Sequence, residues 1–174
     1  MRSRSPTRPS SPLTSGTPTR SWTRFLLTSE SPGTPLLAEQ RFLDVVIDTD
    51  VASLIQKGRT PDWAVRRMAG SRVWLTFVTV GELWKWAEVR SWGRRNRSEL
   101  GAWIARRPVI PYDDAVARNC ASLAAAAQRR GRPRPQNDTW IASCCTRHGI
   151  PLISLNTKDF DDFAAYDGLV LLSE

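Results

Sequence analysis

Hydrophobic and polar positions follow two different periods along the chain, which predicts β-strands separated by α-helices. Short apolar runs rich in β-branched residues, as expected of buried parallel strands, lie at 42–47, 73–78, 109–112 and 152–155, with a further candidate at 169–172. Segments with helical spacing lie at 49–57, 61–69, 79–106 with a break near Gly93, 113–130 and 136–148. This alternation predicts an α/β fold with a mostly parallel sheet of four or five strands.

The N-terminal part of the chain has a different composition. In residues 1–21, every residue other than Met1, Leu13 and Gly16 is Ser, Thr, Pro or Arg. Such a segment buries too little apolar surface to offset the entropy that it would lose on ordering. Residues 1–40 are therefore predicted to be a disordered or non-native extension. Residues 41–174 are predicted to form one domain.

Charge and cysteine content narrow the classes of function. A formal net charge of +8 and a sequence pI of about 10.4 favour an anionic partner, nucleic acid first and an acidic protein second, although solubility alone also explains them. No apolar run approaches the roughly 18 residues of a membrane helix, so we expect no membrane association. The three cysteines, without a CxxC motif, favour free thiols in a reducing cytoplasm over disulfides or structural zinc.

Acidic and amide side chains follow the predicted strands. Asp48 comes directly after the first strand, and Glu82 lies four residues after the second. Asn156 and Asp159 follow the fourth strand. The helix that carries Asp138 near its start is about 12 residues or 18 Å long and ends just before the fourth strand, so it returns Asp138 to the strand-end edge. Because parallel strands end at one edge of a sheet, we expect these side chains to converge there.

Helix capping is the simpler interpretation of each acid taken alone. Thr79 and Glu82 have the spacing of a capping box, and three further acids have the position of first-turn residues that complement a helix dipole, Asp50, Asp138 and Asp159. Several carboxylates at one edge, however, repel one another unless a cation compensates. The pattern therefore predicts Mg²⁺ or Mn²⁺, which prefer carboxylate oxygens and whose bound waters can attack a phosphodiester.

Several stretches resemble the PIN-domain nucleases, and among them the VapC-type toxins of bacterial toxin–antitoxin pairs. They are VVIDTDVASLI at 45–55, TVGELWKWAE at 79–88, GRPRPQNDTWIASCCTRHGIPLISLNTKDFDDF at 131–163 and the closing LVLL. The third stretch is the most distinctive in length and order. The resemblance covers residues 42–174 and implies a PIN-like three-layer α/β/α fold.

The resemblance also implies roles for particular residues. Asp48, Glu82 and Asp138 fall on the family's catalytic and metal-binding acids. A fourth acidic position falls on Asn156, which would be an auxiliary polar residue, and Asp159 is a weaker metal-ligand candidate. The family's activity would be a Mg²⁺-dependent endoribonuclease that hydrolyses RNA to 5′-phosphate and 3′-hydroxyl ends. The implied partners are an RNA substrate, a second copy of the chain in a homodimer, and a cognate antitoxin protein.

Basic and aromatic residues add a second set of expectations. Arg132 and Arg134 lie in the loop before Asp138, within reach of a phosphate at the metal, and are predicted to bind the RNA backbone. The arginines of 94–107 are interpreted as solvated helix faces. Core or dimer packing is preferred over base stacking for the tryptophans of the middle helices, Trp84, Trp86, Trp92 and Trp103.

Three other classes of function remain open at this point. A receiver-like signalling domain would use Asp48, Asp50, Asp113 and Lys158, but it leaves Glu82 and Asp138 without a role. A catalytically inactive RNA-binding module would have no need for clustered acids, which are costly when unpaired. A housekeeping RNA-processing nuclease of the PIN type would use the same acids as a toxin.

Overall fold

A five-stranded sheet forms the centre of the computed structural model, which describes residues 43–174. Its strands are β1 (Asp44–Ile47), β2 (Arg72–Thr76), β3 (Val109–Ile110), β4 (Leu152–Ile153) and β5 (Leu171–Leu172). They lie in the order β3-β2-β1-β4-β5, and every neighbouring pair is parallel. The predicted parallel α/β sheet is confirmed, with five strands. The predicted extension at residues 1–40 lies outside the described residues.

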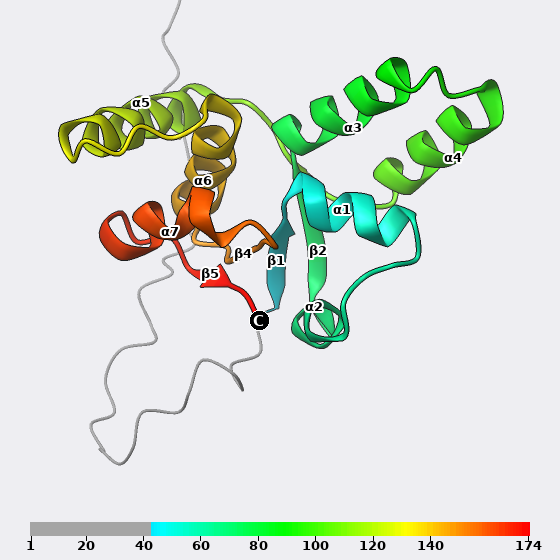
Figure 1. The fold of residues 1–174 in the computed structure, drawn as a ribbon, viewed down its shortest axis with the longest axis horizontal. Coiled ribbons are helices and arrows are strands. Elements are labelled where there is room, and N and C mark those ends of the chain that lie inside the picture. The colour runs from blue at the N-terminus through cyan, green and yellow to red at the C-terminus, as the bar shows by residue number, and fades with distance from the viewer. Residues whose placement is uncertain (1–42) are drawn as a thin grey trace, which may run out of the picture. The chain divides into compact units, whose positions relative to one another are not determined.

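Helices cover both faces of this sheet, which gives the predicted three layers (Figure 1). One face carries α1 (Thr49–Gln56), α2 (Asp62–Met68), α3 (Phe77–Val89) and α4 (Arg94–Ala105). The other face carries α5 (Asp114–Arg129), α6 (Gln136–His148) and α7 (Thr157–Tyr166). In the part of the chain that the structure describes, no helix combines the length and apolar character needed to cross a membrane.

The two hydrophobic cores follow from the two-residue period of the central strand. In β1, Val45 and Ile47 point to the core shared with α1–α4, whereas Val46 points to the core shared with α5–α7. All three side chains are fully buried. β1 therefore lies between β2 and β4, with a layer of helices on each face. The residue that follows β1 is consequently held at a rigid position in the centre of the domain.

The boundary between β2 and α3 differs from the sequence-based prediction. The strand was expected to run to Val78 and the helix to begin at 79, but the helix begins at Phe77. Thr76 is the N-cap, because its hydroxyl accepts the N–H of Thr79 at 3.1 Å. Val78 is apolar because it packs into the core from the first helical turn, not because it belongs to the strand. Glu82 consequently lies in the second turn of α3, one turn later than predicted.

Helix α7 was not predicted as a helix, and a group of buried ion pairs holds it in place. The side chain of Asp162 is fully buried and accepts a hydrogen bond from Nε of Arg130 at 3.0 Å, at the C-terminal end of α5. The same guanidinium donates to Asp167, just after α7, at 2.6 Å. These contacts join the C-terminal end of α5 to the middle and to the C-terminal end of α7. A local periodicity does not reveal such a partner from another part of the chain.

Candidate metal centre

Asp48 occupies the junction between β1 and α1. It is the N-cap of α1, and its Oδ1 accepts the N–H of Val51 at 2.9 Å. Its Oδ2 accepts a hydrogen bond from the hydroxyl of Ser154, which follows β4. The residue is only 4% exposed. The capping interpretation is therefore correct for Asp48, but capping occupies one carboxylate oxygen and does not explain the burial of the whole group.

Burial raises the pKa of the Asp48 carboxyl to about 6. The hydrogen bonds from Ser154 and Val51 oppose this shift, and the charges of Asp50 and Asp138 add to it. A buried carboxylate of this kind is destabilised as an anion unless positive charge approaches it. Among residues 43–174, no basic side chain forms an ion pair with this N-cap carboxylate of α1.

Glu82 faces the N-terminal end of α1 from α3. It accepts hydrogen bonds from the hydroxyl of Thr49 and from Nδ2 of Asn137, the latter at 2.7 Å. The predicted capping box between Thr79 and Glu82 is wrong, because Thr76 caps the helix and the Glu82 carboxylate points to other elements. Glu82 therefore connects α1 to α6 across the strand-end edge of the sheet.

Asp138 lies in the first turn of α6 and is partly buried. Burial raises its pKa to about 6, and repulsion by Asp159, Glu82 and Asp50 adds to the shift. Asp138 lines the same pocket as Asp48 and Glu82, so the helix returns it to the edge where the strands end, as its length predicted. Asp159 accepts a hydrogen bond from Nδ2 of Asn156, so these two side chains form a local pair beside the site.

One pocket of about 140 Å³ collects most of these side chains. Its polar lining is formed by Asp48, Thr49, Asp50, Glu82, Asp138 and Asn156, and its apolar lining by Trp86, Ile141 and Phe160. Within the described part of the chain, no basic side chain contributes to this lining. Asp159 does not line the pocket either, although its charge acts on Asp138. The structure thus brings together the three acids on which the sequence-based hypothesis depends.

The lining residues fit a hard divalent cation in chemistry, though they do not enclose a finished coordination site. Mg²⁺ and Mn²⁺ take carboxylate, carbonyl and water oxygens, and Mg²⁺ retains several waters beside one or two carboxylates. Among residues 43–174, no three His, Cys, Asp or Glu side chains are already drawn together as metal ligands. Carboxylates that repel one another are expected to stay apart in the absence of a cation. Burial is the main cause of the raised pKa values of Asp48 and Asp138, and repulsion by neighbouring acids adds to both.

The two arginines predicted to bind RNA both contact α7. Arg134 is 16% exposed at its side chain and donates to Asp161 at 2.7 Å and to the carbonyl of Lys158. Arg132 is 59% exposed, and its Nη1 lies 3.8 Å from Asp162. Arg134 therefore has a structural contact in addition to any contact with a substrate, whereas the guanidinium of Arg132 is largely accessible.

Several residues of the site were not selected from the sequence. Thr49, Asn137 and Ser154 donate hydrogen bonds to Glu82 or Asp48. Thr49 and Asn137 are each adjacent in sequence to a predicted acid, which is the only local signal that they carry. Trp86 lies four residues after Glu82, on the same face of α3, and this spacing could have placed it beside the pocket.

The receiver-like hypothesis is not supported by the geometry. Asp113 caps α5 by accepting the N–H of Val116 at 2.6 Å, and it does not line the acidic pocket. Lys158 is exposed and is also absent from the pocket lining. The residues that this class of protein would need are therefore not assembled, whereas Glu82 and Asp138, for which it has no role, are.

The fold and this edge of the sheet define a PIN domain. Residues 45–166 match the sequence profile described as "PIN domain", and the chain belongs to this family. The resemblance that the motifs suggested is thereby confirmed over most of the domain. Strands, helices and the acidic edge described above all lie within the matched residues or directly beside them.

Curated relatives with similar sequences carry VapC names. The chain is 26% identical over 120 residues to a tRNA(fMet)-specific endonuclease VapC of Shigella flexneri, a match that covers 68% of this chain and 91% of the relative. It is 23% identical, with the same coverage, to a ribonuclease VapC2 of Haemophilus influenzae. The similarity therefore extends across nearly the whole length of both relatives.

Solved structures of the same fold come from toxin–antitoxin complexes. The VapBC2 complex of Rickettsia felis bound to a promoter DNA fragment contains a chain that matches with a TM-score of 0.63 at 16% identity, covering 74% of this chain and 97% of that one. A VapBC-1 structure from nontypeable Haemophilus influenzae matches with a TM-score of 0.63 at 22% identity, covering 75% and 97%. At these identities the likeness establishes the shared fold.

Proposed function

We propose that this protein is a Mg²⁺-dependent or Mn²⁺-dependent endoribonuclease that acts as the toxin of a toxin–antitoxin pair. The observation that carries the proposal is the pocket that Asp48, Glu82 and Asp138 line together, to which no basic side chain of the described residues contributes. The names of the curated relatives, a tRNA-specific endonuclease and a ribonuclease, support RNA as the substrate.

The acids of the pocket have different proposed roles, metal binding or activation of the attacking water, because their surroundings differ. Asp48 and Asp138 would bind the cation, because both carboxylates are at least partly buried and no basic residue of 43–174 lines the pocket beside them. When bound, the cation supplies charge neutralisation for the phosphodiester and an acidified water as nucleophile. Asn156 adds a neutral polar group at the rim, and Asp159 is kept as a weaker ligand.

Glu82 orients the attacking water or accepts its proton. The Thr49 hydroxyl and the Asn137 amide bind the two oxygens of the Glu82 carboxylate and so fix its orientation. A carboxylate held by two hydrogen bonds keeps its geometry toward the pocket, which is what in-line attack on phosphorus requires. The Ser154 hydroxyl has the same positioning role for Asp48.

The proposal extends to partners and location. An antitoxin partner is supported by the structural neighbours, which come from VapBC and FitAB complexes.

Arg132 is proposed as a contact to the RNA backbone because its side chain is exposed, and Arg134 as a second contact that also anchors α7. A homodimer is proposed from the family resemblance. A cytoplasmic location is proposed, supported by three cysteines that are free and buried.

Cleavage of RNA by the purified chain tests this function. We expect hydrolysis of a structured RNA with Mg²⁺ or Mn²⁺ and none with EDTA, and we expect Asp138→Asn to lower the rate at least a hundredfold, since even indirect metal partners contribute about 10–100-fold. Asp62→Asn is the matched control, because Asp62 is an exposed first-turn acid of α2 outside the pocket. RNA that stays intact with every cation, or an Asp138→Asn variant as active as the control, would contradict the proposal.

Expression in cells separates a toxin from the other candidates. A toxin should arrest growth in a manner that Asp138→Asn abolishes, whereas a housekeeping nuclease of the same chemistry should cleave RNA in vitro without arresting growth. A binding module would bind RNA without cleaving it. The measured quantities are growth rate and the fraction of intact cellular RNA.

A further inference from the structure

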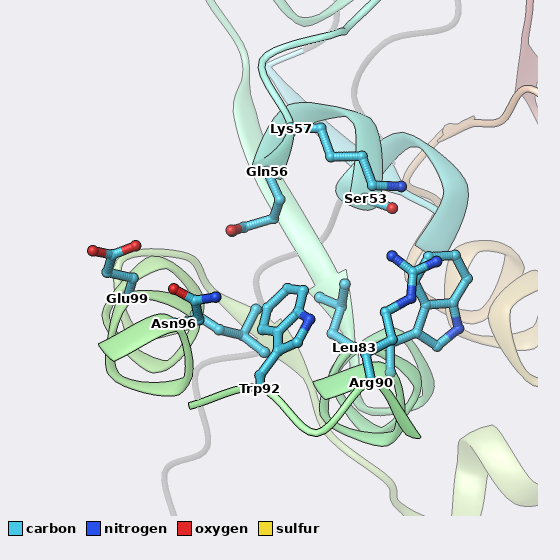
Figure 2. A pocket seen from close by; sticks show the side chains of 10 residues that line it. Ser53, Gln56, Lys57, Leu83, Arg90, Trp92, Asn96 and Glu99 are labelled. Carbon is cyan, nitrogen blue, oxygen red and sulfur yellow. The ribbon is translucent and has the colours of Figure 1, made fainter. Parts of the chain in front are cut away.

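A second pocket lies beside the acidic one and shares a wall with it. It has a volume of about 220 Å³, and it lies between α1, the end of α3 and the start of α4 (Figure 2). Trp86 contributes to the lining of both pockets. Unlike the acidic pocket, the second one carries two basic residues in its lining, Lys57 and Arg90. Its volume is below the roughly 300–1,000 Å³ of sites for drug-sized ligands.

Helices α1 and α3 pack side by side, and residues at four-residue intervals on both helices lead from the acidic pocket to the second pocket. Positions 49 and 53 of α1 and its C-cap Lys57 lie at successive turns of one face, and positions 82 and 86 of α3 and its C-cap Arg90 do the same. The first step joins Thr49 to Glu82 by a hydrogen bond in the acidic pocket. The third step places Lys57 and Arg90 over the ring of Trp86, at 5.3 and 4.7 Å from its centroid. Four residues of helix rise about 6 Å, so the backbones of Lys57 and Arg90 lie roughly 12 Å along the axes from Thr49 and Glu82, and their cationic groups reach back to the ring of Trp86.

The tryptophans of this region fall into two groups. Trp84, Trp92 and Trp103 pack against the core that α1–α4 share with the sheet, which confirms the packing interpretation for them. Trp86 does not belong to that core and instead separates the two pockets. An indole that is only partly buried and flanked by two cations is suited to contact a phosphate or a planar base.

Among residues 43–174, one polar atom of the second pocket is buried without a hydrogen-bond partner, and two of its cations form no ion pair. Nε2 of Gln56 is buried and makes no hydrogen bond within residues 43–174. Figure 2 shows the amides of Gln56 and Asn96 on either side of the space above Trp92. Within the same residues, neither Lys57 nor Arg90 forms an ion pair, while the one acid of the lining, Glu99, is already paired with Arg95.

We propose that this second pocket is a subsite for an unpaired nucleotide of the RNA strand that is cut in the acidic pocket. Lys57 and Arg90 bind a phosphate that neighbours the scissile one. The base enters between Trp86 and Trp92, where the amides of Gln56 and Asn96 bind its polar edge. Amide side chains and aromatic faces are the groups with which proteins recognise single-stranded RNA bases. This inference rests on the proposed function, since it assigns the path of the same substrate.

RNA is favoured over a peptide as the occupant of the second pocket for two reasons. The RNA strand continues covalently from the acidic pocket, and its phosphates are negatively charged. A phosphodiester in the acidic pocket is covalently joined to the next nucleotide, which must cross the adjoining surface. The acidic pocket itself repels phosphates, so attraction must come from a neighbouring surface, and Lys57 and Arg90 provide it. The partner protein is the alternative occupant, and the experiment below distinguishes the two.

The test uses short single-stranded RNA homopolymers of A, C, G and U with the whole chain and Mg²⁺. For Lys57→Ala and Arg90→Ala we expect KM to rise about tenfold or more, as for a lost charged hydrogen bond, with kcat nearly unchanged. On an Asp138→Asn background, each variant should reduce the slope of log affinity against log salt by about 0.7, the value for one phosphate contact to a single strand. Gln56→Leu and Asn96→Leu should instead change the order of preference among the four homopolymers.

Controls keep the two proposals separable. Arg147→Ala removes an exposed arginine from the last turn of α6, outside the second pocket, and should leave KM and the salt slope unchanged. If the parent protein cleaves RNA while the pocket variants match it in KM, salt slope and base preference, the subsite is refuted and the nuclease proposal stands. If the same variants lose only their inhibition by the antitoxin, the pocket belongs to the partner protein and the subsite is likewise refuted. A parent that does not cleave RNA refutes the nuclease proposal instead.

Discussion

Two acidic regions of this molecule differ in how their charge is neutralised. On α7 and just beyond it, Asp162 and Asp167 contact Arg130, and Asp161 contacts Arg134. In the pocket at the strand-end edge, which Asp48, Glu82 and Asp138 line, no basic residue of 43–174 contributes to the lining, and the side-chain hydrogen bonds to Asp48 and Glu82 come from neutral donors.

This difference separates a structural use of carboxylates from a functional one. Hydrogen bonds from Arg130 compensate the buried Asp162, so its charge contributes to the packing of α7 against α5. The pocket acids are instead left with raised pKa values at Asp48 and Asp138, which destabilise the folded protein when both are ionised. A cation supplied from solution would remove this cost, which is the reason for proposing a metal centre at this pocket.

Removal of Asp162 should have the largest effect on stability. Asp162→Ala leaves the partly buried guanidinium of Arg130 with a single carboxylate, and we expect a loss of about 3 kcal/mol in the free energy of unfolding, at the lower end for a broken buried pair. Urea denaturation followed by circular dichroism measures it. The fraction that remains folded should keep its metal-dependent activity, and a stable variant without activity would reverse the roles assigned to the two regions.

Replacement of Asp48 should raise the free energy of unfolding of the metal-free protein, in contrast to the loss expected for Asp162→Ala. Because folding raises the pKa of Asp48 from 3.8 to about 6, the folded state binds the proton more tightly, so stability is greatest below pH 4 and declines as the pH rises toward 6. This decline amounts to about 2 to 3 kcal/mol. Asp48→Asn should remove it, so that the variant is more stable than the parent at pH 7 with EDTA.

Unfolding free energies at a series of pH values test this prediction. The difference between parent and Asp48→Asn isolates the contribution of this one carboxyl from that of other titrating groups. A parent that is more stable than Asp48→Asn throughout, with no dependence of the difference on pH, would mean that Asp48 is an ordinary helix cap.

The contact between Asp161 and Arg134 should make the smallest contribution to the free energy of unfolding. The Asp161 side chain is 58% exposed, so Asp161→Ala should cost less than about 1 kcal/mol, as for other surface ion pairs. Thermal denaturation at low and high salt measures the effect, which should shrink further with salt. A loss as large as that of Asp162→Ala would show that the pairs on α7 act as one unit rather than as a buried and an exposed part.

The sequence was informative wherever a signal was local. The strand and helix order, the break near Gly93 and the end of α6 at Gly149, which adopts φ 64°, all follow from periodicity and from residues with restricted or unusual backbone freedom. The meeting of Asp138 with Asp48 followed from the length of α6 alone. These predictions needed only geometry along one element.

Most of the features that were missed depend on contacts between distant segments. Arg130 organises α7, and the Thr49 hydroxyl binds Glu82. The cap of α3 is a local exception, because Thr76 accepts the N–H of Thr79 three residues later. The position of Trp86 between two pockets has no counterpart in its immediate neighbours along the chain. Tertiary contacts of this kind outweigh local propensity at helix ends and at polar sites.

Direct titration of Mn²⁺ into the metal-free chain at pH 7.5 tests the central claim, that Asp48 and Asp138 hold one cation between them. We predict binding with a stoichiometry of about one by isothermal titration calorimetry, weakened at least about tenfold in both Asp48→Asn and Asp138→Asn and unchanged in Asp62→Asn. A parent that binds no Mn²⁺ at millimolar concentration, or two pocket variants that bind it as tightly as the parent, would contradict the account.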